Sequence, residues 1–340
     1  MTPPPDASGR VGFLVVGSPR SGTTLVQRLA CEIPGVRIPP ETHFFSEFAP
    51  GLIERRRFPL GPAEITEEID RFLALDSARG LQLDPDGVVD ELGGACQSAY
   101  ALFDALVRAL AGPAELWGEK TPGHLLWWRP LATTAPWLRF VVVVRDPRAV
   151  VASNLEMPWR DDPRVPAWGE RRHLAFAVQW RRFQHEVLAM RQALAPDRRL
   201  VLRYEDLVTD PDGARAAMAA FLGRAPGDAA PTRAEGPAPV DIVLPWESWK
   251  RDALGPVRPE LAERWREVLD ERRAEEVATV CRGPMRRFGY DGAPGPARAT
   301  AVLARLGPRP VAALARYRRA YDRYADAIER RRLGPPPSSR

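Results

Sequence analysis

Apolar and polar positions along the chain predict strands that alternate with helices. Residues 13–16 and 140–144 are unbroken apolar runs rich in β-branched residues, a pattern typical of strands buried on both faces. A shorter strand is predicted from Leu116, and another over residues 200–207, which runs into a loop. Because helical segments separate these strands, we expect an α/β fold with a central parallel sheet.

Apolar residues spaced three and four positions apart predict the helices. The predicted helical segments are 60–112, 170–194, 212–222, 258–281 and 311–333. Gly223 is expected to end the third of them. The first segment interrupts the alternation of strands and helices, so we interpret it as a helical insertion that covers the site or shapes an acceptor pocket.

The pattern suggests one main domain with two flanking segments. Residues 1–10 are expected to be a disordered leader, residues 11–290 the domain, and residues 291–340 a helical extension with a flexible tail. The Pro/Ala/Gly-rich residues 224–239 are predicted to be a flexible connection inside the domain.

Composition excludes several classes of protein. The chain has 340 residues and a formal net charge of only +5, which does not favour nucleic acid as a partner. No apolar run approaches the roughly 20 residues of a membrane span, and no secretory signal is present, so we expect a cytoplasmic protein. Three scattered cysteines indicate neither a disulfide framework nor a zinc site, and no metal is expected.

The strand at residues 13–16 is followed by a turn suited to binding an anion. Gly17 and Gly22 bracket the turn, and Thr23 opens a helix, so free backbone N–H groups and the positive end of the helix dipole converge there. The spacing is similar to the phosphate-binding pattern G-x-x-x-x-G-K-[ST], but Thr23 stands in the lysine position and the cation is Arg20. A small-molecule kinase of this type therefore becomes the alternative rather than the first hypothesis. A strand–turn–helix corner without a ligand is the simplest structural alternative.

A second basic group follows the strand at residues 140–144. Arg145 lies at the carboxyl end of that strand, where open parallel sheets bind ligands. Two basic strand ends on one sheet indicate a ligand with negative charge at both ends. The alternative is a structural arginine paired with Asp146, in a protein that binds an anion without catalysis.

These motifs resemble those of sulfotransferases that use 3′-phosphoadenosine 5′-phosphosulfate (PAPS). PRSGTTL (residues 19–25) resembles their 5′-phosphosulfate loop, and FVVVVRDPRAVVAS (residues 140–153) resembles their 3′-phosphate site. RYEDL (residues 203–207) is similar to a later landmark of bacterial members. The resemblance covers residues 11–290 and implies a three-layer fold of the P-loop-NTPase-like type.

The resemblance also implies which residues hold PAPS. The 5′-phosphosulfate would be bound by Pro19, Arg20, Ser21, Gly22, Thr23 and Thr24. Arg145 and Ser153 would hold the 3′-phosphate, with Lys250 and Arg251 adding charge there. Tyr204 would line the adenine.

Sulfuryl transfer needs a base for the acceptor and positive charge on the departing oxygen. Glu41 in PETHFF is similar to a catalytic glutamate of the family and is our predicted base, with His43 as its rival. Lys120 in GEKTP resembles a lysine near the sulfuryl group and would stabilise the leaving group together with Arg20. It is one of only two lysines, and Glu119 beside it is its expected ion-pair partner. The acceptor would be a small molecule or a carbohydrate with a hydroxyl or an amine, and a homodimer is left open.

Overall fold

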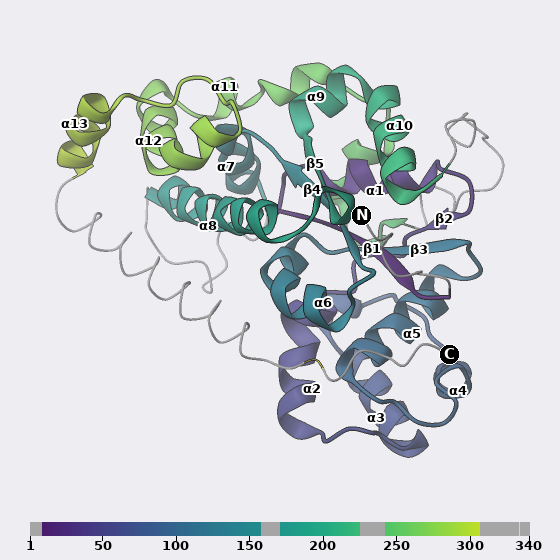
Figure 1. Ribbon diagram of the computed structural model, residues 1–340. Coiled ribbons are helices and arrows are strands. Elements are labelled where there is room, and N and C mark those ends of the chain that lie inside the picture. Colours follow the sequence, from purple (N-terminus) through teal and green to yellow (C-terminus); the bar gives the residue numbers. More distant parts are fainter. Residues whose placement is uncertain (1–8, 158–170, 225–241, 307–332, 334–340) are drawn as a thin grey trace.

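Five parallel strands form the central sheet of the computed structural model, which describes residues 9–157, 171–224, 242–306 and 333 (Figure 1). The strand order is β2-β3-β1-β4-β5. The strands are β1 (Val11–Gly17), β2 (Val36–Arg37), β3 (Leu116–Lys120), β4 (Arg139–Val144) and β5 (Arg199–Arg203). Every residue of β1 is buried, as expected of a central strand covered on both faces.

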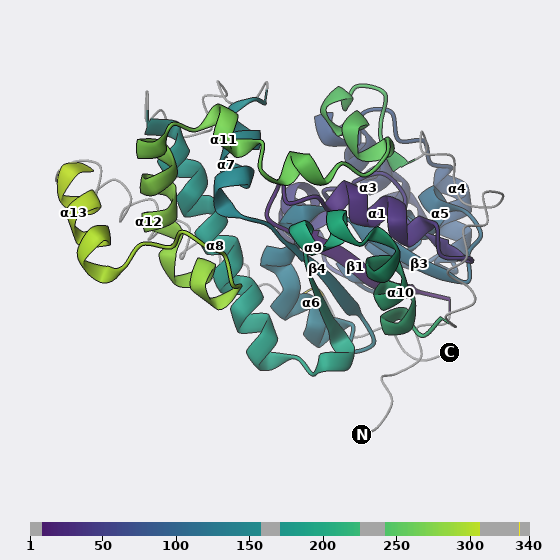
Figure 2. The same cartoon turned by 90° about the horizontal axis from the view of Figure 1, so that it is seen from above.

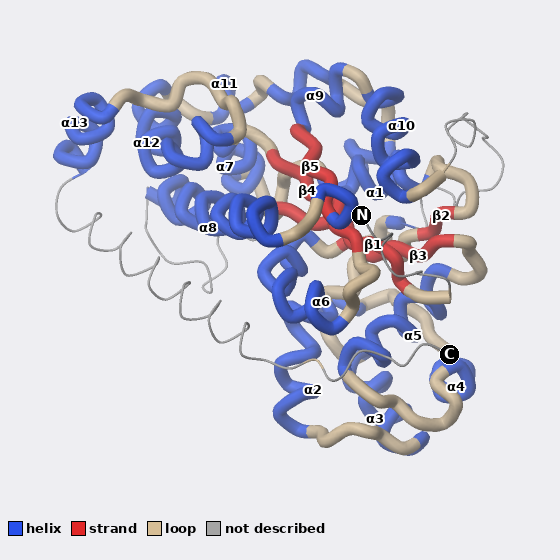
Figure 3. The backbone as a smooth tube through the Cα atoms, viewed as in Figure 1, coloured by secondary structure: helices blue, strands red, loops and turns tan. Residues whose placement is uncertain are grey.

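Helices cover both faces of this sheet, so the domain has three layers (Figure 3). On one face lie α1 (Thr23–Cys31), α9 (Tyr204–Thr209) and α10 (Pro211–Leu222), which Figure 2 shows over the strands. On the other face lie α5 (Ala99–Ala111), α6 (Trp128–Thr134), α7 (Pro147–Leu155), α8 (Arg172–Ala193) and α12 (Glu271–Arg287). The remaining helices are α2 (Ala49–Arg55), α3 (Pro62–Leu73), α4 (Pro85–Glu91), α11 (Trp265–Val268) and α13 (Pro296–Leu306).

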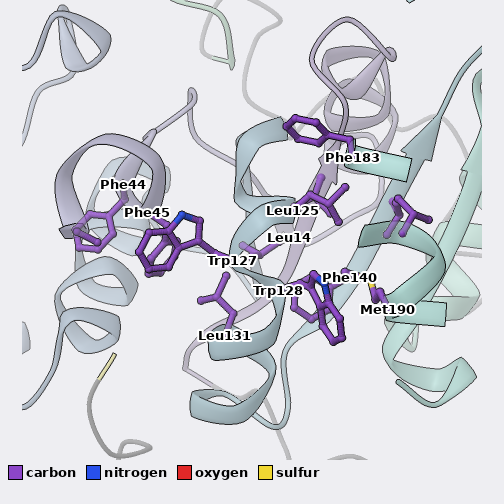
Figure 4. Close-up of a cluster of buried hydrophobic side chains, with 14 of the residues drawn as sticks. Leu14, Phe44, Phe45, Leu125, Trp127, Trp128, Leu131, Phe140, Phe183 and Met190 are labelled. Carbon is purple, nitrogen blue, oxygen red and sulfur yellow. The ribbon is translucent and has the colours of Figure 1, made fainter. Parts of the chain in front are cut away.

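The alternation of side chains along β1 divides the core in two. Phe13 and Val15 pack with α1, α9 and α10, whereas Leu14 and Val16 pack with the larger cluster on the opposite face. Figure 4 shows part of that larger cluster, in which Leu14 lies near Leu125 and Trp127. Phe44 and Phe45 belong to the same cluster, so the short π-helix that contains them is anchored in the core.

Two predicted elements differ in the structure. The strand predicted over residues 200–207 ends at Arg203, and α9 follows it without a loop. The single helix predicted over residues 258–281 is instead a 3₁₀ turn, α11 and the start of α12. The break occurs because Leu269 is extended and the Asp270 carboxylate accepts a hydrogen bond from the Arg273 N–H, which caps a new helix.

Other predictions can be placed only in part. Residues 60–112 contain α3, α4 and α5, and Gly223 ends α10 in a left-handed conformation (φ 78°). Residues 1–8 of the predicted leader, 225–239 of the predicted connection and 311–332 of the helix predicted over 311–333 lie outside the described residues. Across the part of the chain that the structure describes, no helix is both long and apolar enough to cross a membrane.

Candidate functional site

The carboxyl ends of four strands meet at one edge of the sheet and bring the predicted motifs together. Val15 pairs with Lys120, Gly17 with Val143, and Val144 with Arg203. The segments that follow these strand ends line a cavity of about 840 Å³. That volume lies in the range of small-molecule and cofactor sites.

The turn after β1 has the backbone of an anion-binding loop. Gly22 has a φ of 98°, and a Cβ atom there would lie 2.3 Å from the Tyr204 ring, so only glycine fits. Gly22 also provides no side-chain cap for α1, which leaves the first amides of that helix available to a ligand. Thr23 and Thr24 follow it and line the cavity.

Arg20 links the two predicted PAPS motifs. It lies in the left-handed region (φ 69°), and its Nε donates to the Ser153 Oγ at 3.0 Å. Burial, and then the nearby charge of Arg145, lower the pKa of Arg20 to about 10. Within the described ranges neither guanidinium group forms a salt bridge, although Glu41, Asp252 and Glu156 act on Arg20 from farther away. Two neighbouring guanidinium groups of this kind favour an anion as their partner.

Arg145 is held by neutral groups. Its Nη2 donates to the Leu261 carbonyl at 2.9 Å, and its guanidinium lies 4.0 Å from the centre of the Tyr204 ring. Its buried Nε has no hydrogen-bond partner. The alternative pairing with Asp146 is wrong, because that carboxylate binds Arg148 at 2.5 Å. Among the described residues, no carboxylate lies within salt-bridge distance of Arg145.

Glu41 is the centre of a buried charge cluster. Its carboxylate binds Lys120, lies 2.7 Å from the Lys250 Nζ, and lies 3.0 Å from the His43 Nε2. Lys250 also binds Glu247. Two lysines and two glutamates are therefore joined beside the anion loop, and Lys120 additionally lies 3.5 Å from the Thr24 Oγ1.

The cluster changes the proton affinity of its members. Burial acts to raise the pKa of Glu41, but Lys120, Lys250 and His43 together lower it well below its usual value. Burial lowers the pKa of Lys120 to about 8, with Lys250 adding to the shift and Glu41 opposing it. Burial opposes the charged form of His43, but Glu41 outweighs it and raises the pKa of His43. Glu41 is thus ionised and Lys120 can release a proton near neutral pH.

Three sequence-based assignments are corrected here. Glu119 is not the partner of Lys120, because consecutive residues of β3 point to opposite faces and the lysine binds Glu41 instead. Lys250 contacts Glu41 and Glu247 rather than a group of the predicted 3′-phosphate site. Arg251 is exposed and does not line the cavity.

Glu247 is a cavity residue that the sequence analysis missed. It is buried, and both of its carboxylate oxygens are engaged, one by Lys250 and one by the Leu244 N–H. Its spacing of three residues before one of only two lysines in the chain was the available signal.

The cavity continues beyond Glu41 toward the helical insertion. Trp246 and Trp249 form an edge-on pair with ring centres 5.5 Å apart, and the Trp246 Nε1 donates to the Arg79 carbonyl at 2.8 Å. Asp76 and Ser77 of the insertion line the same end. Asp76 and Ser77 are the residues of 60–112 that line the cavity, and the role of this segment in shaping an acceptor pocket stays a prediction.

Metal ligands are not grouped in the described ranges, in which no set of three or more His, Cys, Asp or Glu side chains is arranged to hold an ion. Among the described residues, the lysine and arginine side chains that line the cavity are those of Arg20, Arg145, Lys250, Arg258 and Arg264.

Comparison with known proteins gives one family and a set of similar structures. A model of the sulfotransferase family matches residues 13–226. The chain is similar to the sulfotransferase domain from the curacin biosynthetic pathway, with 17% identity and a TM-score of 0.52, over 83% of this chain and 98% of that domain. It is also similar to the sulfotransferase domain of the Synechococcus PCC 7002 olefin synthase, with 20% identity and a TM-score of 0.54, over 85% of this chain and 98% of that domain. A comparison with curated protein sequences gives no match.

Proposed function

The chain belongs to the sulfotransferase family, and from this premise we propose that it transfers the sulfuryl group of PAPS to a hydroxyl or amine of a small-molecule or carbohydrate acceptor. The observation that carries the proposal is the cavity itself. It joins the anion loop and Arg145 to a buried carboxylate, Glu41, that two lysines hold in its ionised form.

The donor end of the cavity suits a ligand with two separate anionic groups. We assign the 5′-phosphosulfate to the loop from Pro19 to Thr24, where Arg20, hydroxyls and the amides of α1 converge. We assign the 3′-phosphate to Arg145 and Ser153, since the Arg145 Nε is buried without a partner. Tyr204, which supports Arg145 and contacts the loop at Gly22, is assigned to the nucleotide end.

Glu41 is assigned as the base of an in-line displacement at sulfur. The acceptor oxygen forms a bond to sulfur, the bond from sulfur to the bridging oxygen breaks, and the electron pair of that bond stays on the departing 5′-phosphate. The acceptor proton goes to Glu41. A carboxylate of low pKa can accept it because the hydroxyl becomes acidic as the new bond forms.

Positive charge at the bridging oxygen is assigned to Arg20 and Lys120. Lys120 is fully buried beside the anion loop and Arg20 is partly buried in it, so water screens their charges less than at the surface. His43, whose Nε2 lies 3.0 Å from Glu41, is assigned to orient that carboxylate rather than to replace it. Each such charged contact is worth about 1.5–3 kcal/mol.

The acceptor end offers an aromatic wall and hydrogen-bonding groups. Trp246 and Trp249 can pack against a ring, and Asp76 and Ser77 can contact its hydroxyls. This combination supports a hydroxylated ring compound, either a sugar or an aromatic small molecule.

The proposal is tested by incubating the protein with radiolabelled PAPS and a panel of such acceptors. We expect label to move to at least one hydroxylated ring compound without added metal. The kinase alternative predicts the opposite pattern, with no transfer from PAPS and magnesium-dependent turnover of ATP. That pattern would overturn the proposed function.

A further inference from the structure

A second buried glutamate lies behind the cavity and holds the segment that carries Glu41. Glu119 is fully buried and does not line the cavity. Its Oε1 accepts hydrogen bonds from the Thr42 N–H (3.2 Å), the Thr42 hydroxyl (2.9 Å) and the Thr121 hydroxyl (2.6 Å). Its Oε2 lies 2.8 Å from the His124 Nδ1. Glu119 therefore binds Thr42 of the segment that follows Glu41, and Thr121 and His124 of the segment that follows β3.

Four consecutive backbone amides of the segment after Glu41 bind side chains. The Thr42 N–H donates to Glu119 and the Phe44 N–H to the Thr42 hydroxyl, at 3.2 and 3.3 Å. The His43 N–H donates to the Thr121 Oγ1 at 3.2 Å, and the Phe45 N–H to the His124 Nε2 at 3.1 Å. Three of the four acceptors are side chains of residues 119–124, and the fourth is the Thr42 hydroxyl, which itself donates to Glu119. The side chains of 119–124 therefore hold the backbone of this segment, directly or through Thr42.

The hydrogen bonds also determine the tautomer of His124. Its Nε2 accepts the Phe45 N–H, so the ring proton must lie on Nδ1, where it faces the Glu119 carboxylate. When a carboxylate accepts the proton of one ring nitrogen, the other nitrogen is left as an acceptor and can hold a donor in a fixed position. Here that donor is a backbone N–H of the segment that bears Glu41.

We propose that Glu119 and His124 are positioning residues for sulfuryl transfer, which fix the backbone of residues 42–45 so that Glu41 and His43 face the reacting groups. This inference rests on the proposed function. The strongest support is His43, which lies in the left-handed region (φ 50°) although it is not glycine. Such a conformation persists only where the surroundings hold it, and the Thr121 hydroxyl binds its N–H.

The choice of residues supports positioning over simple packing. A buried carboxylate is costly to desolvate, and among the described residues no lysine or arginine lies within salt-bridge distance of Glu119 to offset that cost. Burial acts to raise the pKa of Glu119, but His124, Thr121 and Thr42 lower it below its usual value. A carboxylate can accept hydrogen bonds from the Thr42 N–H, the Thr42 and Thr121 hydroxyls and the His124 Nδ1–H at once, and an apolar side chain cannot.

The first test is Glu119→Gln, which keeps the size of the side chain. An amide NH₂ facing the His124 Nδ1 favours the other tautomer, which removes the acceptor for the Phe45 N–H. We expect kcat to fall roughly 10–10²-fold, as for other small displacements of a catalytic group. Binding of 3′-phosphoadenosine 5′-phosphate (PAP), the product nucleotide, should change less than about twofold because the anion loop is untouched.

Nuclear magnetic resonance of the imidazole groups gives a readout that needs no turnover. The chain has four histidines, so their nitrogen signals can be assigned by substitution. In the wild type we expect His124 as the Nδ1–H tautomer and His43 titrating above its usual range. His43 is faced by Glu41, Glu47 and Lys250, and Glu41 makes the largest contribution that raises its pKa. In Glu119→Gln the pKa of His43 should fall toward its usual value, as Glu41 is no longer held against it.

Glu276→Gln is a matched control. Glu276 is buried and binds another histidine, His173, at 2.6 Å, but this pair joins α8 and α12 away from the cavity. The control should lose a similar amount of thermal stability and keep kcat and the titration of His43. If Glu119→Gln behaves like Glu276→Gln in both readouts, the positioning role is wrong.

A pair of His124 variants keeps the proposal testable if Glu119→Gln does not fold. His124→Asn retains a donor toward Glu119, whereas His124→Gln retains an acceptor toward the Phe45 N–H. We expect both variants to lower kcat, because each removes one of the two hydrogen bonds that link Glu119 through His124 to the Phe45 N–H. Unchanged kcat in both would overturn the proposal. A wild type with the expected histidine spectra but no sulfuryl transfer would instead contradict the proposed function alone.

Discussion

Two buried glutamates, Glu41 and Glu119, lie close together in this fold and have opposite surroundings. Glu41 is met by two ammonium groups and an imidazole and faces the cavity. Glu119 is met by hydroxyls, a backbone amide and a histidine nitrogen, and does not line it. The pKa of both carboxylates is lowered, so both are ionised. Only Glu41 has lysine side chains as partners, and these could also contact an anionic ligand. We infer that the first carboxylate takes part in chemistry and that the second holds it in place.

The largest effect in this comparison is expected from Glu41→Gln. The amide cannot accept the acceptor's proton, so turnover should fall roughly 10²–10⁴-fold, as is typical when a general base is lost. Binding of PAP should persist, because the anion loop and Arg145 are unaffected. Steady-state kinetics and calorimetry measure the two quantities separately.

His43→Asn separates the two candidate bases. If His43 only orients Glu41, its loss should cost less turnover than the loss of Glu41. An equal or larger loss in His43→Asn would transfer the role of base to the histidine.

Another prediction concerns Lys250, which helps to lower the pKa of Glu41. A group with a lowered pKa loses its charge only at low pH, so the acidic limb of kcat/KM should lie below the usual carboxylate range. In Lys250→Met the pKa of Glu41 should rise, so this limb should move to higher pH. Because the variant also lacks the ammonium charge of Lys250 in the cavity, kcat/KM at neutral pH should fall about 10-fold or more. A pH profile of both proteins checks this, and an unmoved limb would mean that Glu41 does not titrate in the reaction.

The alkaline limb tests Lys120 in the same way. The pKa of Lys120 is lowered to about 8, chiefly by burial, so the free enzyme should lose the ammonium as pH rises through that value. We expect kcat/KM to decline above about pH 8, and the decline to move to higher pH in Lys120→Arg, because arginine stays protonated. If the limb stays in place in Lys120→Arg, another group is responsible for it.

The sequence allowed the layers and the two basic turns at the strand ends to be predicted because both are local, whereas the binding of PAPS by those turns stays a prediction. Residues 13–16 and 140–144 have a strand pattern, and Arg20 and Arg145 follow directly from the turns after them. The charge cluster could not be predicted in the same way. Lys250 lies 2.7 Å from Glu41, although the two residues are more than two hundred positions apart in the sequence. A hydrophobic pattern along the chain does not predict a contact over that separation.

One error could have been avoided by applying strand geometry more strictly. Glu119 and Lys120 are neighbours on β3, so their side chains must point to opposite faces and cannot form an ion pair. That alternation also separates the two glutamate clusters, because Lys120 reaches Glu41 from one face and Glu119 binds Thr42 from the other.

Calorimetric titration with PAP, beside the same nucleotide without its 3′-phosphate, tests the central claim most directly. It probes the two basic strand ends as one binding site and needs no knowledge of the acceptor. We predict that the wild type binds PAP and discriminates against the nucleotide that lacks the 3′-phosphate. In Arg145→Ala that selectivity should collapse. A wild type that does not bind PAP, or that binds both nucleotides equally, would contradict the account.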